Sequence, residues 1–160
     1  MAKKKDGGDR FRDIAQNRKA FHDYEILERL EAGLVLHGSE VKGLRDRGAN
    51  IREAHALFRD GEAWLVGAHI SEFAQAGMSG HDPRRERKLL MHRREIESLA
   101  GRVAERGLAV VPLRLYFKDG RAKIEIALVR GKAHHDRRRD IAERDAAREM
   151  ARAVRGKRPR

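Results

Sequence analysis

Histidine and carboxylate side chains are numerous enough in this sequence to raise the question of catalysis or metal binding. The chain has 8 histidines and 25 acidic residues, and two segments, His81–Asp82 and His134–Asp136, place them side by side. Adjacent histidines in a basic segment do not surround a cation, however, and neighbouring arginines repel one. The chain has no cysteine or threonine, and none of its four serines lies in a nucleophile motif. We therefore predict no catalytic residue, no metal site and no cofactor.

A second group of reactive side chains is basic and lies directly before an apolar run. Its members are Arg84, Arg85, Arg87 and Lys88. Four cations at this spacing can straddle a phosphate backbone, and the following Leu89, Leu90 and His92 offer flat surface beside them. The alternative is a charged loop that caps the next helix, with both leucines in the core. The residues alone favour neither interpretation.

The net charge indicates the kind of partner. Lysine and arginine number 37 against 25 acidic residues, a formal net charge of +12, and the excess lies mainly in residues 1–19 (+4) and 131–160 (+6). Such a balance favours a polyanion. Neither basic segment has the large apolar residues that anchor a protein on a membrane, and no apolar run is long enough for a signal peptide or a spanning helix. We expect a cytoplasmic protein that binds nucleic acid and no membrane.

Alternating apolar residues predict that residues 20–130 form a mostly β domain. Asp60–Gly61 and Asp119–Gly120 each separate two alternating stretches, which predicts two tight antiparallel hairpins. A further strand begins at Tyr24, and a helix follows from about His92 to Arg106. Five or six strands with two or three short helices predict a small barrel of the oligonucleotide-binding (OB) type, because closure removes exposed strand edges. Another small barrel or an α+β sandwich fits the same periodicity.

The two ends of the chain are predicted to be basic arms. Residues 1–19 lack periodicity, which is typical of a flexible arm. Residues 131–160 combine a thin apolar stripe with a basic helical face formed by Arg144, Arg148, Arg152 and Arg155. Because isolated helices of this length are marginal in water, we expect this tail to be disordered until it binds and then helical. A solvated arm that only aids solubility is the alternative.

Three blocks of sequence resemble a known family at matching spacing. Residues 31–51 resemble an EAGL…GxEVKxxRxGxxN block, residues 82–96 resemble DPxRxRKLLLHxxEI, and residues 131–138 resemble GKxxxDKR, with Arg137 in place of its lysine. These blocks are those of the SsrA-binding protein (SmpB) family, the partner of transfer-messenger RNA in rescuing stalled ribosomes. The resemblance implies an OB barrel that grips the tRNA-like domain of that RNA.

The resemblance also implies roles for individual residues. It places Glu31, Leu90 and His92 on the RNA-binding face, with Tyr24 and Arg45 as weaker candidates. It implies that the tail enters the decoding centre and messenger channel of the stalled 70S ribosome, as an anticodon arm would. The tail residues that match the family's junction motif are Gly131, Lys132, His135, Asp136, Arg137 and Arg138. On this view the chemistry belongs to the ribosome, and the chain is not an enzyme.

Two rival functions are compatible with a basic OB barrel. The first is a ribosomal protein or an initiation-type factor built on the same barrel, which a co-purifying RNA would distinguish. The second is a basic nuclease or RNA-modifying enzyme. Such an enzyme needs a pocket of convergent carboxylates or a cofactor motif, and the sequence contains neither pattern.

Overall fold

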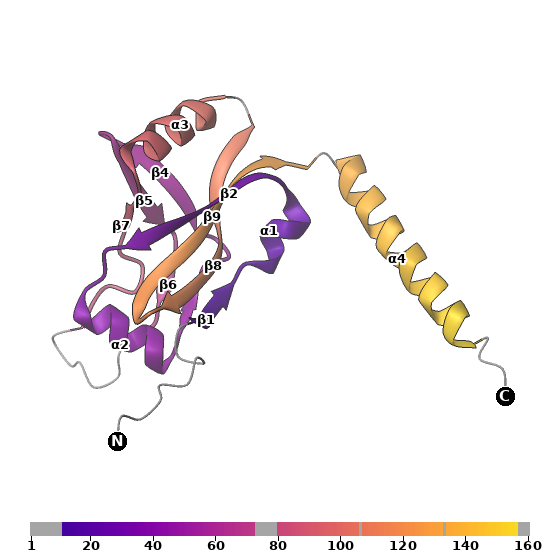
Figure 1. Cartoon of the computed structure of the whole chain (residues 1–160), viewed down its shortest axis with the longest axis horizontal. Coiled ribbons are helices and arrows are strands. Elements are labelled where there is room, and N and C mark those ends of the chain that lie inside the picture. Colours follow the sequence, from indigo (N-terminus) through magenta and orange to yellow (C-terminus); the bar gives the residue numbers. More distant parts are fainter. Residues whose placement is uncertain (1–10, 73–79, 106, 133, 157–160) are drawn as a thin grey trace, which may run out of the picture.

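A seven-stranded antiparallel sheet forms the body of the protein (Figure 1). The computed structural model describes residues 11–72, 80–105, 107–132 and 134–156. In spatial order the strands are β1 (Phe11–Gln16), β8 (Leu108–Lys118), β9 (Arg121–Gly131), β2 (Tyr24–Leu34), β7 (Arg87–Leu90), β5 (Glu62–Val66) and β4 (His55–Arg59). The sheet curls until β4 packs against β8. The result is a partly open barrel of the OB type, the predicted fold class.

Short elements complete the barrel. Strands β3 (Ala49–Asn50) and β6 (His69–Ile70) pair as a separate two-stranded sheet. The helices are α1 (Arg18–Asp23), α2 (Gly38–Asp46), α3 (Arg93–Val103) and α4 (His134–Gly156). None of the helices in the described segments is both long and apolar enough to cross a membrane.

Both predicted hairpins are confirmed. Strands β4 and β5 meet at Asp60 and Gly61, and β8 and β9 meet at Asp119 and Gly120. All four residues have positive φ, at 52° and 74° in the first turn and 50° and 77° in the second. Two consecutive positive φ angles define the turn whose twist matches that of the flanking strands, which is why the Asp-Gly pair predicted it.

Strand alternation divides the side chains between the barrel interior and its outer surface. On β9, Ile124, Ile126 and Leu128 point inward and are fully buried with β8 and β5 residues in the main core. The residues between them point outward. Toward the end of β9, two of these outward residues, Ala127 and Val129, are covered by Ala20 of α1, which forms a small second core. The rest of this outer surface is left uncovered by α1.

The predicted helix after residue 92 is confirmed as α3. Ile96 and Leu99 are its buried residues. The backbone N–H of His92 donates to the Glu95 carboxylate at 3.1 Å, which satisfies a donor that the helix itself leaves free. The helix therefore starts directly after the apolar run and fixes where His92 stands.

The barrel domain begins earlier in the chain than the predicted boundary at residue 20. Residues 11–16 form β1 on the edge of the sheet, paired with β8, and residues 18–23 form α1. Asn17 joins them: its side-chain amide donates to the Pro112 carbonyl at 2.9 Å, and its side-chain oxygen accepts from the Ala20 N–H at 3.2 Å. Because β1 is held by backbone hydrogen bonds and buries few apolar residues, its sequence lacks the alternation that predicts a strand. Residues 1–10 of the predicted arm lie outside the described residues.

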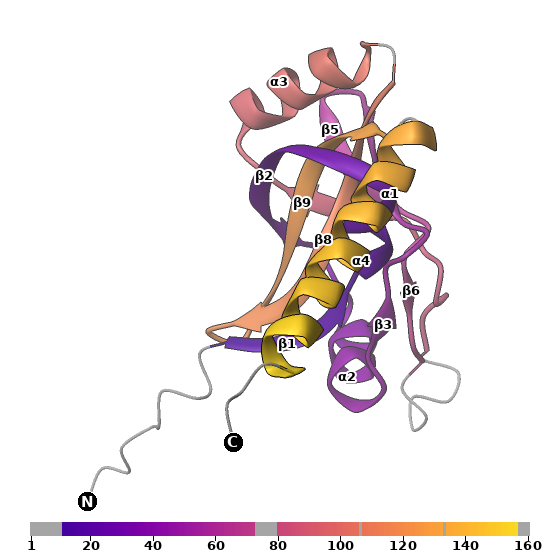
Figure 2. The ribbon, with the colours of Figure 1, turned by 90° about the vertical axis from the view of Figure 1, so that its right-hand side faces the viewer.

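The last helix stands apart from the barrel. Figure 1 shows α4 as a rod beside the barrel, and Figure 2 shows the same helix from its own side, in front of the sheet. All side chains described from Ile141 to Arg155 are exposed. Residues 134–156 form the helix α4, and the disorder of this tail before binding, with helix formation on binding, stays a prediction.

Candidate nucleic-acid interface

The predicted contact residues Glu31 and Leu90 share the outer face of the sheet. In the register of β2, Glu31 lies opposite Glu125, and Gly33 lies opposite both Lys123 of β9 and Leu90 of β7. Residues two apart on a strand point to the same side, so Glu31, Gly33, Leu90 and Lys123 belong to one surface. We call this surface, together with Tyr116 and Lys118 of β8, the outer face.

Glu31 is held by two neighbours on β8. The Tyr116 hydroxyl donates to its Oε2 atom, and the Lys118 Nζ lies 3.4 Å from its Oε1 atom. The hydrogen bond from Tyr116 lowers the pKa of Glu31 below its ordinary value, and the charges of Lys118 and Lys123 act in the same direction against a partial desolvation. Glu31 is therefore an anchored carboxylate in a basic surrounding.

Leu90 is a surface residue and not part of the core. Its side chain is 53% exposed, whereas the preceding Leu89 is 1% exposed and packs inside. A Cβ at Gly33 would lie only 3.2 Å from the Leu90 Cβ, so the missing side chain at Gly33 gives Leu90 its room. The strand therefore presents one leucine to solvent and buries the other.

A hollow of about 300 Å³ adjoins Leu90 at the end of the barrel nearest α2. Val41, Leu90 and Phe117 contribute apolar walls, and Arg121 and Lys123 also line it. The Arg45 guanidinium lies 5.2 Å from the centroid of the Phe117 ring. Arg45 thus belongs to the same end of the barrel as Leu90, where an apolar surface with adjacent cations is suited to an unstacked base and its phosphate.

His92 stands at the edge of this region, two residues after Leu90. Its side chain is exposed, its backbone N–H donates to Glu95, and its carbonyl accepts from the Ile96 N–H at 3.1 Å. The imidazole ring is therefore presented to solvent at the start of α3. This placement is compatible with the predicted contact.

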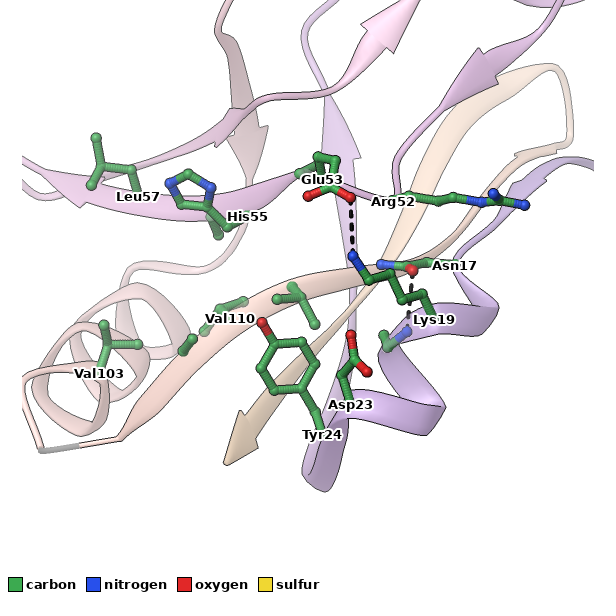
Figure 3. Close-up of a pocket in the computed structure, with 15 residues that line it drawn as sticks. Asn17, Lys19, Asp23, Tyr24, Arg52, Glu53, His55, Leu57, Val103 and Val110 are labelled. Carbon is green, nitrogen blue, oxygen red and sulfur yellow. Dashed lines mark hydrogen bonds and ion pairs between the residues drawn. The ribbon is translucent and has the colours of Figure 1, made fainter. Parts of the chain in front are cut away.

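Tyr24 lies far from these residues. It starts β2 and pairs with Gly131 at the end of β9. Glu31 follows seven positions later on β2, roughly 23 Å away at the usual rise per residue. Tyr24 lines a cavity of about 410 Å³, and Figure 3 shows its ring pointing into this cavity. Lys19 and Glu53 form an ion pair of 3.2 Å in the same cavity wall. The structure therefore does not bring Tyr24 into the outer face around Glu31.

The prediction of a phosphate contact was wrong for Arg87. Its side chain is completely buried, with Nε 2.5 Å from the Glu40 Oε2 atom and the other nitrogens donating to the carbonyls of Ala68 and Pro83 at 2.8 and 3.0 Å. Arg85 also donates to Glu40, with its Nε at 3.2 Å. Side chains alternate along β7, which explains why Arg87 is buried and Lys88 is not. Arg87 and Leu89 point inward, while Lys88 and Leu90 point outward.

The buried Glu40 is the centre of this arrangement. Burial alone would raise the pKa of Glu40, but hydrogen bonds from Arg85, the His37 backbone and Arg87 outweigh it and lower the pKa. Two of the four predicted basic contacts thus support the fold. The remaining two are placed outward: Arg84 is exposed, and Lys88 is half-exposed and pairs with Glu62 at 2.9 Å.

The tail begins at the Tyr24 end of the barrel. The Lys132 N–H donates to the Asp23 carbonyl at 3.1 Å, and its Nζ reaches the Phe21 carbonyl at 3.4 Å. Arg138 and the four arginines of the predicted basic face are exposed; these four are Arg144, Arg148, Arg152 and Arg155. His135, Asp136 and Arg137 lie in α4, but their side chains fall outside the described residues.

Three residues of the outer face were missed in the sequence. Tyr116 and Lys118 alternate with buried residues along β8, and Lys123 does so along β9, so strand alternation marks them as outward-facing once the hairpin is known. The alternation says nothing about the contact with Glu31, which depends on the pairing of β2 with β9. No three histidine, aspartate or glutamate side chains gather as metal ligands within the described part of the chain.

The fold and this outward surface define a small, mostly β protein with an OB-type barrel and a basic helical tail. A model of the SmpB protein family matches residues 14–156. The SsrA-binding protein of Desulforudis audaxviator is 56% identical over 144 residues, covering 90% of this chain and 94% of that protein. The SsrA-binding protein of Thermobifida fusca is 53% identical and covers 98% of both chains. The chain belongs to the SmpB protein family.

A solved structure agrees with this assignment. It is described as "tmRNA-SmpB: a journey to the center of the bacterial ribosome", and one of its chains is 44% identical to this protein with a TM-score of 0.65. The match covers 76% of this chain and 86% of that chain. The likeness therefore includes most of the barrel described above.

Proposed function

We propose that this protein binds the tRNA-like domain of transfer-messenger RNA and delivers that RNA to stalled 70S ribosomes for trans-translation. The observation that carries the proposal is membership of the SmpB family over residues 14–156, with relatives named as SsrA-binding proteins. The likeness to a chain of the tmRNA-SmpB ribosome structure supports the same partner. The protein acts in the cytoplasm, where ribosomes work, and supplies contacts instead of catalysis.

The barrel supplies the RNA-binding surface in this proposal. Glu31 accepts a hydrogen bond from the RNA, Leu90 and His92 contact unstacked bases, and Arg45 lies near their phosphates. Arg84 and Lys88 are the outward cations of the basic run and contribute to phosphate binding. Tyr24 belongs to a separate contact near the root of the tail.

The tail acts on the ribosome. We propose that α4 enters the empty decoding centre and messenger channel, where it replaces the anticodon arm that transfer-messenger RNA lacks. An exposed helix with arginines at spacings of four, four and three fits an RNA-lined channel, because each arginine offers a fork of donors to phosphates. The junction residues Gly131 and Lys132 set the position of the helix, and His135, Asp136, Arg137 and Arg138 contact the ribosome near its start.

Truncation after Lys132 tests both halves of the proposal. The hairpin of β8 and β9 is complete at Gly131, and the Lys132 N–H still bonds to Asp23, so the barrel keeps its contacts. We expect the truncated protein to melt like the full chain and to bind the tRNA-like domain with unchanged affinity, but to tag no nascent chains on stalled ribosomes. Normal tagging by the truncated protein would rule out the role of the tail, and loss of RNA binding with an intact melt would place the RNA site in the tail.

A further inference from the structure

We propose that Tyr116 is a positioning residue, which holds the Glu31 carboxylate as an acceptor for an N–H or O–H donor of the bound RNA. The inference rests on the proposed function, because it describes the chemistry of one contact in that interface. It concerns a tyrosine that lies outside the three family-like blocks of the sequence. Its support is geometric and comes from side chains of β1, β8 and β2.

The Tyr116 ring is fixed by β1 and β8. Its side chain is only 3% exposed. The Phe11 ring stacks on it with centroids 4.8 Å apart and planes inclined by 26°, and the Arg114 guanidinium lies 4.8 Å from the Tyr116 centroid. Arg114 forms an ion pair with Asp13, whose Oδ1 atom is 3.3 Å from Arg114 Nε, without a hydrogen bond between these two atoms. With the ring held by these contacts, the Tyr116 hydroxyl donates to Glu31.

Glu31 keeps unused acceptor capacity. A carboxylate has about four acceptor positions on its two oxygens. The Tyr116 hydroxyl takes one on Oε2, and Lys118 approaches at the longer distances of 3.4 and 3.5 Å. The side chain is 40% exposed, so its remaining acceptor positions face solvent. The carboxylate is thus oriented by its contacts with β8 and is accessible from the solvent side.

This orientation selects the kind of group that Glu31 can meet. A carboxylate repels phosphates, so its place on an RNA-binding face is favourable only against a donor, which in RNA is a base N–H or a ribose hydroxyl. Lys118 and Lys123 lie on the same face and offset the repulsion from the rest of the backbone. Fixing the carboxylate before binding also removes the entropy that a free glutamate side chain would lose.

A double-mutant cycle separates positioning from independent contact. Tyr116→Phe removes only the hydroxyl, and Glu31→Gln replaces the anionic acceptor with an amide of the same shape. We expect each to weaken binding of the transcribed tRNA-like domain about fivefold to tenfold, and the double variant to bind no worse than Glu31→Gln. Additive losses would mean that Tyr116 acts without Glu31 and would overturn the inference.

The pH dependence of binding gives a second readout that a purely structural role leaves unmoved. In the natural protein the Tyr116 hydrogen bond lowers the pKa of Glu31, so Glu31 stays ionised at pH values below its ordinary pKa. As the pH is lowered, we expect RNA binding by Tyr116→Phe to begin to weaken at a higher pH than binding by the natural protein. Coincident pH profiles, after the melt of each variant has been recorded, would overturn the inference.

Glu25 offers a matched control for Glu31, because both glutamates lie on β2. It is 60% exposed and lies 3.9 Å from Arg130, away from Tyr116. We expect Glu25→Gln to bind the RNA like the natural protein. If the natural protein itself fails to bind the tRNA-like domain, the proposed function fails. If it binds and Tyr116→Phe binds equally well, the proposed function stands and the inference about Tyr116 is wrong.

Discussion

Replacing Arg87 with methionine tests whether the basic run before Leu89 binds RNA or supports the fold. Methionine keeps an unbranched apolar side chain in the interior and removes the guanidinium. That guanidinium is fully buried, donates to Glu40 and also serves the carbonyls of Ala68 and Pro83. The substitution therefore removes the guanidinium donors to Glu40, Ala68 and Pro83, while Arg85 and the His37 backbone still donate to Glu40.

The expected loss of stability follows from the buried ion pair. Removing one partner of such a pair typically costs about 3–5 kcal/mol, because a buried charge is left uncompensated. Arg85 keeps its own hydrogen bonds to Glu40, with Nε at 3.2 Å, so we expect about 3 kcal/mol, the lower end of the range. A domain stabilised by roughly 5–15 kcal/mol remains folded at low temperature after this loss.

Urea unfolding and RNA binding measured on the same samples give the answer, with Arg84→Met as the matched control. Arg84 is exposed, so we expect its variant to unfold within about 0.5 kcal/mol of the natural protein. The slope of log binding constant against log salt concentration should become shallower for the Arg84→Met variant, by roughly one phosphate contact. For Arg87→Met we expect a lower midpoint and an unchanged salt slope for the folded fraction. Unchanged unfolding together with a shallower slope would refute the structural role of Arg87.

Three further predictions concern binding and acid stability. RNA binding should weaken steeply as salt increases, since lysine and arginine contacts release counterions; equal affinities across ionic strengths would argue against a phosphate-led interface. His92→Ala should lower RNA affinity by about 1–3 kcal/mol if the ring stacks on a base, with little change in melting, because its backbone N–H still caps α3; unchanged binding would remove His92 from the site. The pKa of Glu40 is lower in the folded chain than the ordinary value of 4.5, so its contribution to stability is present above that value and is lost as the pH falls through the folded pKa. We expect Glu40→Gln to unfold more easily at pH 7 and to lose less stability than the natural protein between pH 5 and pH 3, and parallel curves would contradict this.

Local patterns predicted the elements that local physics determines. The two Asp-Gly turns and the amphipathic α3 were read correctly because a positive φ pair and a helical apolar stripe leave a direct mark on the sequence. Strand β1 left no such mark, since backbone pairing to β8 holds it and its side chains are largely exposed. The edge of a sheet is a property of the assembled fold.

The candidate site divides in the same way. A run of cations indicates nucleic acid, but which of them reach the surface depends on the phase of β7, and the sequence alone does not fix whether Arg87 or Lys88 points inward. The buried partner of Arg87 is Glu40, which lies 47 residues earlier in the chain. The anchoring of Glu31 by Tyr116 spans 85 residues and three strands, so it too depended on the assembled sheet.

The central claim is that transfer-messenger RNA is the partner of this chain, and sequencing the RNA that co-purifies with the full-length protein from its own cells tests it most directly. The protein is captured at moderate salt and washed until ribosomes are removed. We expect transfer-messenger RNA to be enriched far above its share of cellular RNA, and the enrichment to fall for Glu31→Gln. Ribosomal or ordinary transfer RNA in proportion to cellular abundance, with no enrichment of transfer-messenger RNA, would contradict the account and favour a ribosomal or initiation-type role for the barrel.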